Sequence, residues 1–294
     1  MRHLAFLLSL AFVFGACGPS DNGEGDPDGG VDAPPGCNRP DLDEPGLKAY
    51  VTGVVQQLAA APRANTTQRE AARMYLSNEL AALGWQPQLQ TYANGANVFA
   101  TIPATMGDGK MIVVGAHFDT VANSPGANDN ASGVAVVLSL ARYLKDTPCR
   151  TAPITIVLFD QEELGLFGSR AYAQTLVPAN VRAVHTIDQV AWDEDGDRVF
   201  ELELPTATLE AEWRAAANVV GVTVETTTTT GTDHTAFRDR GFAAMGLTEE
   251  FVGGDTSPLR HLPGDTPASI EPYLDYLVLA AKLTGQVVLE EVSP

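Results

Sequence analysis

Residues 111–117 read Met-Ile-Val-Val-Gly-Ala-His, a continuous apolar run that ends in a histidine. Such a run is typical of a central strand buried on both faces of a sheet. Two further runs of this kind occur at 154–159 and 184–190, and a helical pattern over 133–145 separates the first two. Strands that alternate with helices predict an α/β domain whose largely parallel sheet is covered on both faces.

The alternation continues outward in both directions along the chain. We expect the other helices at 46–61, 66–84, 208–220 and 267–285, and short strands at 87–91, 97–102 and 242–248. In open sheets of this type, ligands bind where strands end and loops begin. Residues that follow the strands are therefore the candidates for a functional site.

The first residues of the chain do not belong to this domain. The apolar run Leu4–Phe14 is shorter than the roughly 20 residues that a helix needs to cross a bilayer, and it predicts a secretory signal. Small residues precede Cys17, and this segment resembles the lipobox of bacterial lipoproteins, although Phe14 replaces the usual leucine. We expect a signal peptide over 1–17 with lipidation at Cys17, and a secreted protein without the lipid is the alternative. In either case the protein is exported, free or anchored to the bacterial cell envelope at the outer membrane.

Residues 18–43 are dominated by glycine, proline and aspartate and predict a flexible acidic tether ahead of a domain over 44–290. The formal net charge of the chain is −19. An acidic protein lacks the basic face that nucleic-acid binding needs, so we exclude that class of partner. Contact with a membrane is expected only through a lipid on Cys17.

Two cysteines, Cys37 and Cys149, remain after Cys17. Export to an oxidising compartment would permit a disulfide that joins the end of the tether to the domain. Two free thiols are the alternative that the sequence leaves open.

Polar residues follow the first two buried strands. His117 and Asp119 lie two residues apart, so in extended chain they face the same side. The histidine can bind a metal while the aspartate acts beside it. Glu162 and Glu163 come soon after the second strand, and two adjacent carboxylates repel each other unless a cation lies between them.

Three more candidates lie elsewhere in the chain. Asp129 lies in Pro125–Gly133, where small residues allow the backbone to wrap closely ahead of a helix. Asp188 ends the third strand, and His261 lies in the loop RHLPGDT. Each alone has a structural explanation, such as helix capping for Asp129. Together they are the residue types that a pair of zinc ions requires.

Six stretches resemble the bacterial zinc aminopeptidases of the leucyl aminopeptidase type, whose wider family includes glutamate carboxypeptidases and animal glutaminyl cyclases. They occur in the family's order, and the resemblance covers about residues 45–285. The stretches are GAHFDTV (115–121), PGANDNASG (125–133), FDQEELGLFGS (159–169), TIDQV (186–190), TGTDHTAF (230–237) and RHLPGDT (260–266). The resemblance implies a three-layer αβα sandwich of the zinc peptidase and phosphorylase type, with a mostly parallel, mixed central sheet.

The resemblance also implies a role for each candidate in a site with two zinc ions per chain. His117 and Asp188 would bind one ion, Glu163 and His261 the other, and Asp129 would bridge them. The two remaining residues would be catalytic, with Glu162 as the general base and Asp119 as its support.

The activity implied is that of an exported metallo-aminopeptidase that removes N-terminal residues from peptides with free amino termini. A hydroxide activated by the two zinc ions would attack the peptide carbonyl, and Glu162 would pass the proton to the departing amine. A glutaminyl cyclase or a carboxypeptidase of the same family is an alternative, as is a surface-binding lipoprotein without catalysis. The last is disfavoured because the base and all five ligands are present.

Three further residues differ from the proposed ligands. His234 in TGTDHTAF is expected beside the ligands or the substrate, and His185 is expected to be structural because it points away from the face that carries Asp188. Arg260 departs from the family, in which many members have tyrosine before the final histidine. The tyrosine hydroxyl could assist the reaction intermediate, and an arginine would either supply a positive charge there instead or point outward.

Overall fold

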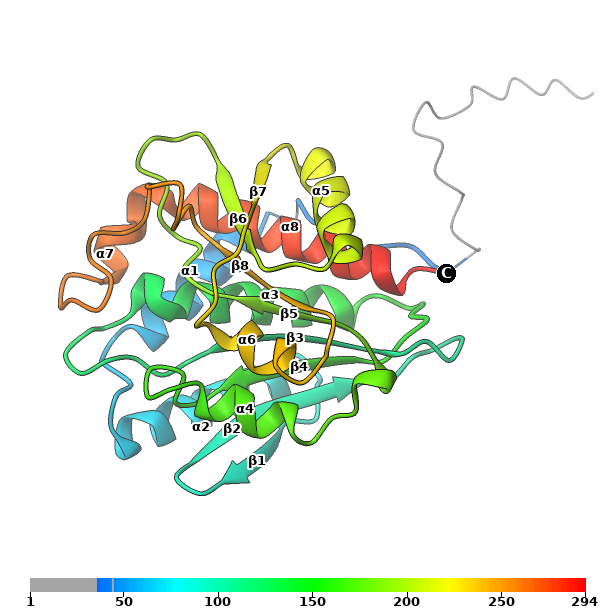
Figure 1. Cartoon of the computed structure of the whole chain (residues 1–294), viewed down its shortest axis with the longest axis horizontal. Coiled ribbons are helices and arrows are strands. Elements are labelled where there is room, and N and C mark those ends of the chain that lie inside the picture. The colour runs from blue at the N-terminus through cyan, green and yellow to red at the C-terminus, as the bar shows by residue number, and fades with distance from the viewer. Residues whose placement is uncertain (1–35, 44) are drawn as a thin grey trace, which may run out of the picture. The chain divides into compact units, whose positions relative to one another are not determined.

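An eight-stranded mixed sheet runs through the computed structural model, which describes residues 36–43 and 45–294 (Figure 1). The strand order is β1-β2-β4-β3-β5-β8-β6-β7. The four central strands β4, β3, β5 and β8 are parallel, whereas β2 and β6 flank them antiparallel. The strands are β1 (Gln88–Tyr92), β2 (Gly95–Ile102), β3 (Met111–His117), β4 (Ile154–Phe159), β5 (Val181–Ile187), β6 (Val199–Glu203), β7 (Thr223–Thr227) and β8 (Ala244–Thr248).

Helices cover both faces of the sheet, as Figure 1 shows. Helices α1, α2, α3, α5 and α8 supply the larger hydrophobic core on one face, and α4 and α6 pack on the other. The helices are α1 (Leu47–Leu58), α2 (Thr66–Ala82), α3 (Gly133–Lys145), α4 (Phe167–Ala173), α5 (Ala207–Val220), α6 (Asp233–Arg238), α7 (Pro267–Ile270) and α8 (Leu274–Val292). The expected three-layer sandwich with a mostly parallel, mixed sheet is confirmed.

The apolar runs explain why the central strands lie in the middle. Along β3, Ile112 and Val114 pack in the larger core while Val113 packs in the smaller one. Strand β4 alternates in the same way, with Ile156 on one side and Val157 on the other. Because successive side chains point to opposite faces, a strand buried on both faces must be apolar at every position.

Several elements differ from the sequence-based expectation. Strand β5 covers 181–187 rather than 184–190, so Asp188 follows the strand. The last long helix begins at Leu274, not at 267, because Pro272 lies in a separate short turn before it. Strands β6 and β7 were not expected: β6 buries Glu201 and Glu203, and β7 is mostly exposed, so neither has an unbroken apolar run.

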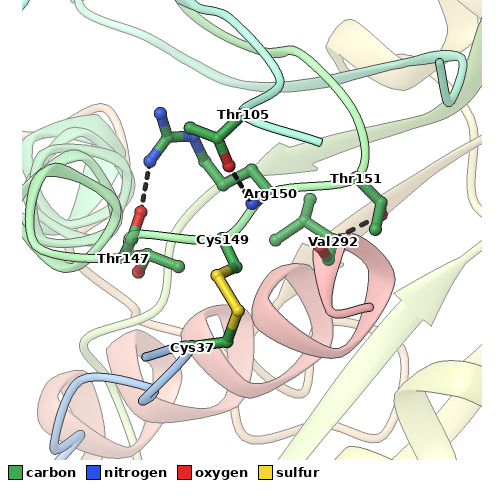
Figure 2. Close-up of a disulfide and its surroundings, with 7 residues drawn as sticks. All are labelled: Cys37, Thr105, Thr147, Cys149, Arg150, Thr151 and Val292. Atoms are coloured by element: carbon green, nitrogen blue, oxygen red, sulfur yellow. Dashed lines mark hydrogen bonds between the residues drawn. A yellow bond between two sulfur atoms is a disulfide. The ribbon is translucent and has the colours of Figure 1, made fainter. Parts of the chain in front are cut away.

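A disulfide joins Cys37 to Cys149, which confirms the first of the two alternatives for these cysteines (Figure 2). Their Cα atoms are 5.2 Å apart, and the bond links positions 112 residues apart. Figure 2 shows the neighbouring loop held by Arg150, whose backbone N–H donates to Thr105 Oγ1 at 2.7 Å. A crosslink over such a long loop stabilises a fold by about 2–4 kcal/mol.

The predicted signal peptide over 1–17, residues 18–35 of the predicted tether and residue 44 lie outside the described residues. Within the part of the chain that the structure does describe, no helix combines the length and apolar character needed to cross a membrane.

Candidate metal centre

The central parallel strands β4, β3, β5 and β8 all end at the same end of the sheet. His117 is the last residue of β3, and Asp188 directly follows β5. Glu162 and Glu163 lie in the turn after β4, and His261 lies in the long loop after β8. The topology therefore gathers residues from distant parts of the sequence at the carboxyl end of the sheet, where open α/β sheets bind ligands.

Asp129 reaches the same place from a tight turn over Ala127–Ser132 that leads into α3. Gly126, just before the turn, has φ +65°, and a Cβ atom there would collide with the carbonyl oxygen of Asp129. A Cβ on Gly133, just after it, would collide with the carbonyl oxygen of Ile187. The small residues of this stretch thus allow the backbone that carries Asp129 to press against β5.

The carboxylate of Asp129 lies between the two histidines. Its Oδ1 is 3.4 Å from His117 Nε2, and its Oδ2 is 3.1 Å from His261 Nε2. His117 Nε2 also lies 3.3 Å from Asp188 Oδ1, and His261 Nε2 lies 3.2 Å from Glu163 Oε2. The five side chains therefore form two groups of three, each with one histidine and one carboxylate of its own, which share Asp129.

Asp119 lies behind these groups and holds the turn that carries the two glutamates. Its Oδ1 accepts a hydrogen bond from the backbone N–H of Glu162 at 2.9 Å, and its Oδ2 accepts one from Glu163 at 3.2 Å. Its Oδ1 also lies 3.5 Å from His117 Nδ1. Asp119 thus orients one histidine and both glutamates, while the Glu162 side chain belongs to neither group of three.

The pKa values of these side chains reflect crowded, buried carboxyl groups. Burial raises the pKa of Glu162 to about 9 and that of Glu163 to about 7, and neighbouring carboxylates add to both shifts. Burial would lower the pKa of His117, but Asp188 and the other surrounding carboxylates outweigh it and raise the pKa well above its usual value. Ionisation of all these carboxyl groups would place more negative charge here than two imidazoles can balance, so bound cations would favour their ionised form.

The donor atoms fit such cations. Four buried atoms of the two groups make no hydrogen bond among the described residues, namely Asp129 Oδ2, Glu163 Oε1, Asp188 Oδ1 and His261 Nε2. Buried polar atoms are normally satisfied, so these atoms need partners that the protein does not supply. Imidazole nitrogens with carboxylate oxygens are the ligands that zinc takes in catalytic sites. The set is suited to two divalent ions that share Asp129.

Arg63, which we did not single out from the sequence, supports the loop between His117 and Asp129. It is 3% exposed and lies between α1 and α2. Its guanidinium donates to the carbonyl oxygens of Leu58, Phe118, Pro125 and Gly126 at 2.5–2.9 Å. Because its partners are backbone atoms, no pattern of side chains in the sequence could have revealed this role.

Asp265 also holds the turn that carries Asp129. Its carboxylate accepts hydrogen bonds from the backbone N–H groups of Asn128 at 2.7 Å and Asp129 at 3.0 Å. The side chain of Asn128 in turn donates to the buried Glu249 at 2.8 Å. The motif RHLPGDT contains Asp265, so the sequence offered a signal here, but it could not show which backbone the carboxylate meets.

Asp160 fixes the other end of the turn that carries the glutamates. It is fully buried, and its carboxylate pairs with Arg69 at 2.9 Å and Arg73 at 2.8 Å, both on α2. The backbone N–H of Asp160 donates to Asn97 on β2 at 2.9 Å. Helix α2 and strand β2 thereby position the start of the segment that ends in Glu163.

Two other histidines among the described residues, His185 and His234, lie apart from the two groups. His185 is buried between Trp213, which donates to its Nδ1 at 3.1 Å, and Glu291, whose Oε2 is 3.1 Å from its Nε2. His234 is buried against Glu203 and Thr232, with Nδ1 at 3.2 Å and 2.7 Å from their side-chain oxygens. Neither histidine belongs to a group of three that could hold a metal ion.

We expect Arg63→Met to lower the free energy of unfolding by about 3 kcal/mol or more, because several buried carbonyl oxygens lose their donor. The variant should also bind metal more weakly, since the loop that leads to Asp129 loses its support. Urea unfolding and metal content measured by atomic emission check both effects. Arg63→Lys keeps the charge but not the planar donors, so its stability and metal content should lie between those of the wild type and those of Arg63→Met. A wild-type unfolding curve together with wild-type metal content in Arg63→Met would contradict this role.

Among curated proteins, the chain is similar to aminopeptidase YwaD of Bacillus subtilis, at 33% identity over 174 residues that cover 53% of this chain and 36% of that protein. It is also similar to the probable lipoprotein aminopeptidase LpqL of Mycobacterium tuberculosis, at 42% identity over 66 residues, or 22% of this chain and 13% of that protein. The matched segments thus span well under half the length of these relatives.

Among solved structures, BSAP, a zinc aminopeptidase from Bacillus subtilis, matches with a TM-score of 0.63 and 26% identity over 69% of this chain and 52% of that one. Glutaminyl cyclase of Porphyromonas gingivalis matches with a TM-score of 0.71 over 83% and 98%, and its 20% identity shows likeness of fold alone. The sequence model of peptidase family M28 matches residues 97–276, which is more than half of the chain. The resemblance of the six motifs is thus confirmed, and the chain belongs to peptidase family M28.

Proposed function

We propose that this protein is an exported aminopeptidase that binds two zinc ions and removes N-terminal residues from peptides. One observation carries the proposal: two groups of metal-binding side chains share Asp129, while Glu162 lies beside them and belongs to neither. In this assignment His117 and Asp188 bind one ion, and Glu163 and His261 bind the other. Two metals and a free base are what hydrolysis of an amide by an activated water needs.

When bound, zinc supplies Lewis-acid polarisation of a carbonyl group and lowers the pKa of a water. Glu162 accepts the proton of the attacking water and delivers it to the nitrogen of the departing amine. Asp119 keeps Glu162 in place through its backbone N–H, and it orients His117 from the Nδ1 side. The carboxyl-rich surroundings favour a substrate with a protonated amino terminus.

The names of two relatives favour an aminopeptidase over the other reactions of this fold, since YwaD and BSAP are both described as aminopeptidases. The likeness to a glutaminyl cyclase concerns the fold alone.

Export is part of the proposal. The disulfide of Cys37 and Cys149 supports it, because such bonds persist in oxidising compartments. We propose a signal peptide over 1–17, a lipid on Cys17 that anchors the protein to the cell envelope at the outer membrane, a tether over 18–43 and the peptidase domain over 44–290. The relative LpqL, described as a probable lipoprotein aminopeptidase, supports the anchor.

Zinc-loaded protein should hydrolyse leucine amide and leucyl dipeptides but not their N-acetylated forms, because the free amine is part of what the site recognises. Excess chelator should abolish the activity, and added zinc should restore it. Release of leucine measured by chromatography checks both. Hydrolysis of N-blocked substrates at a similar rate, cyclisation of N-terminal glutamine in preference to hydrolysis, or full activity in chelator would each refute the proposal.

Glu162→Gln should retain two zinc ions per chain yet reduce kcat by roughly 10²–10⁴-fold, the usual contribution of a general base. Glu163→Gln is the matched control, because the adjacent residue is assigned to a metal and its loss should lower the zinc content. Metal analysis and steady-state kinetics on the same preparations separate the two roles. If Glu162→Gln lost zinc or turned over normally, the base would have to be another residue.

Cys17→Ser should move the protein from the membrane fraction to the soluble fraction, since the thiol that carries the lipid is gone. Cell fractionation with an antibody against the domain measures this. Ser20→Ala serves as the control, because it changes a residue close to Cys17 in the sequence and leaves both the thiol and the disulfide intact. Membrane association of Cys17→Ser equal to that of the wild type would rule out the anchor.

A further inference from the structure

Arg260 presents unused hydrogen-bond donors beside the metal groups. Its Nε lies 3.6 Å from Asp129 Oδ2, the carboxylate that both groups share, and its guanidinium lies over the ring of Phe251 at 5.5 Å. The side chain is 40% exposed, and within residues 36–43 and 45–294 its terminal nitrogens form no hydrogen bond. One edge of the guanidinium thus faces Asp129, and the terminal nitrogens are free to bind a ligand.

The backbone around Arg260 fixes this position. Its N–H donates to the carbonyl oxygen of Ser257 at 3.3 Å, and the N–H of Ser257 donates to Glu249 at 2.8 Å. Glu249 directly follows β8 and is fully buried. The next residue, His261, adopts φ +63°, which turns the chain sharply between the arginine and the proposed metal ligand. The guanidinium is thereby held on the same side as the imidazole.

Because carboxylates surround the site, an arginine with free hydrogen-bond donors there indicates a place for an anionic group of the substrate. The proposed ligands and their neighbours are carboxylates, and they suit the amino end of a substrate. Arg63 also lies close to them, but it is buried and donates to four backbone carbonyls. An anionic part of a substrate would therefore meet its partner at Arg260.

The distance restricts which anion that is. The carbonyl under attack must lie against the metal groups around Asp129, and consecutive Cα atoms are only about 3.8 Å apart. In a dipeptide, the C-terminal carboxylate belongs to the residue directly after the attacked carbonyl. It therefore lies within reach of a guanidinium next to Asp129. In a longer peptide, a neutral peptide group occupies that place. A guanidinium can bind both oxygens of a carboxylate at once, which a single neutral carbonyl cannot match.

We propose that Arg260 binds the C-terminal carboxylate of the leaving residue, so that dipeptides are the preferred substrates. This inference rests on the proposed aminopeptidase function and adds the class of peptide on which it acts. It also assigns a role in substrate selection to position 260, where many members of the family have tyrosine. The contact with the ring of Phe251 restricts the positions that the guanidinium can take beside Asp129.

The test compares substrates that differ only in the carboxylate. We would measure kcat/KM of zinc-loaded wild type, Arg260→Gln, Arg260→Lys and Arg198→Gln for leucyl-glycine and for leucyl-glycinamide, with the zinc content of each preparation. Arg198 is exposed, has no role in the site and serves as the matched control. We expect the wild type to favour the dipeptide, and the ratio of the two kcat/KM values to fall by about 10- to 100-fold in Arg260→Gln. Arg260→Lys should fall less, and Arg198→Gln should keep the wild-type ratio.

Binding gives a second readout that does not depend on turnover. Calorimetry of zinc-loaded Glu162→Gln should show tighter binding of leucyl-glycine than of the amide, and the added Arg260→Gln change should remove the difference. An unchanged ratio in Arg260→Gln, or equal losses for both substrates, would overturn the role of Arg260 while the aminopeptidase assignment stands. Failure of every protein to hydrolyse either free-amine substrate would overturn both.

Discussion

The shared carboxylate of Asp129 is the constraint on which the rest of the site depends. One of its oxygens faces His117 and the other faces His261, so a displacement of this side chain alters both metal groups at once. Because the carboxylate is 3% exposed, solvent cannot compensate for a wrong position. The backbone that carries Asp129 must therefore be held in one position. Small residues on both sides of the turn make its close approach to β5 possible.

Around this carboxylate, the buried polar side chains form hydrogen bonds with the backbone rather than with the candidate ligands. Arg63 donates to the loop before the turn, Asp265 accepts from the turn itself, and Asp119 accepts from the turn that holds both glutamates. One atom in each of four candidate ligands makes no hydrogen bond among the described residues, namely Asp129 Oδ2, Glu163 Oε1, Asp188 Oδ1 and His261 Nε2. Such a division holds the site in place and leaves the ligands available for metal, at the expense of stability in the region that carries them.

The sequence predicted the central fold and the composition of the site because each rests on a local pattern. Buried strands such as β3 need an unbroken apolar run, and the polar residues after them must lie at the carboxyl end of a parallel sheet. Strands β6 and β7 have no such pattern, because buried glutamates occupy the first and solvent surrounds the second. The role of Arg63 was equally out of reach, since its partners are carbonyl groups that every residue possesses.

The disulfide and the metal groups lie at opposite ends of the central strands. Cys149 precedes β4, and its bond to Cys37 fixes the start of the domain there, whereas Glu162 and Glu163 come after the same strand. The six residues of β4 separate these ends by roughly 20 Å at about 3.3 Å per residue. The ion pair of Arg39 with Glu290 at 2.5 Å ties the same segment to the last turns of α8. Cys37, close to the start of the described residues, therefore lies at the end of the sheet opposite the metal groups.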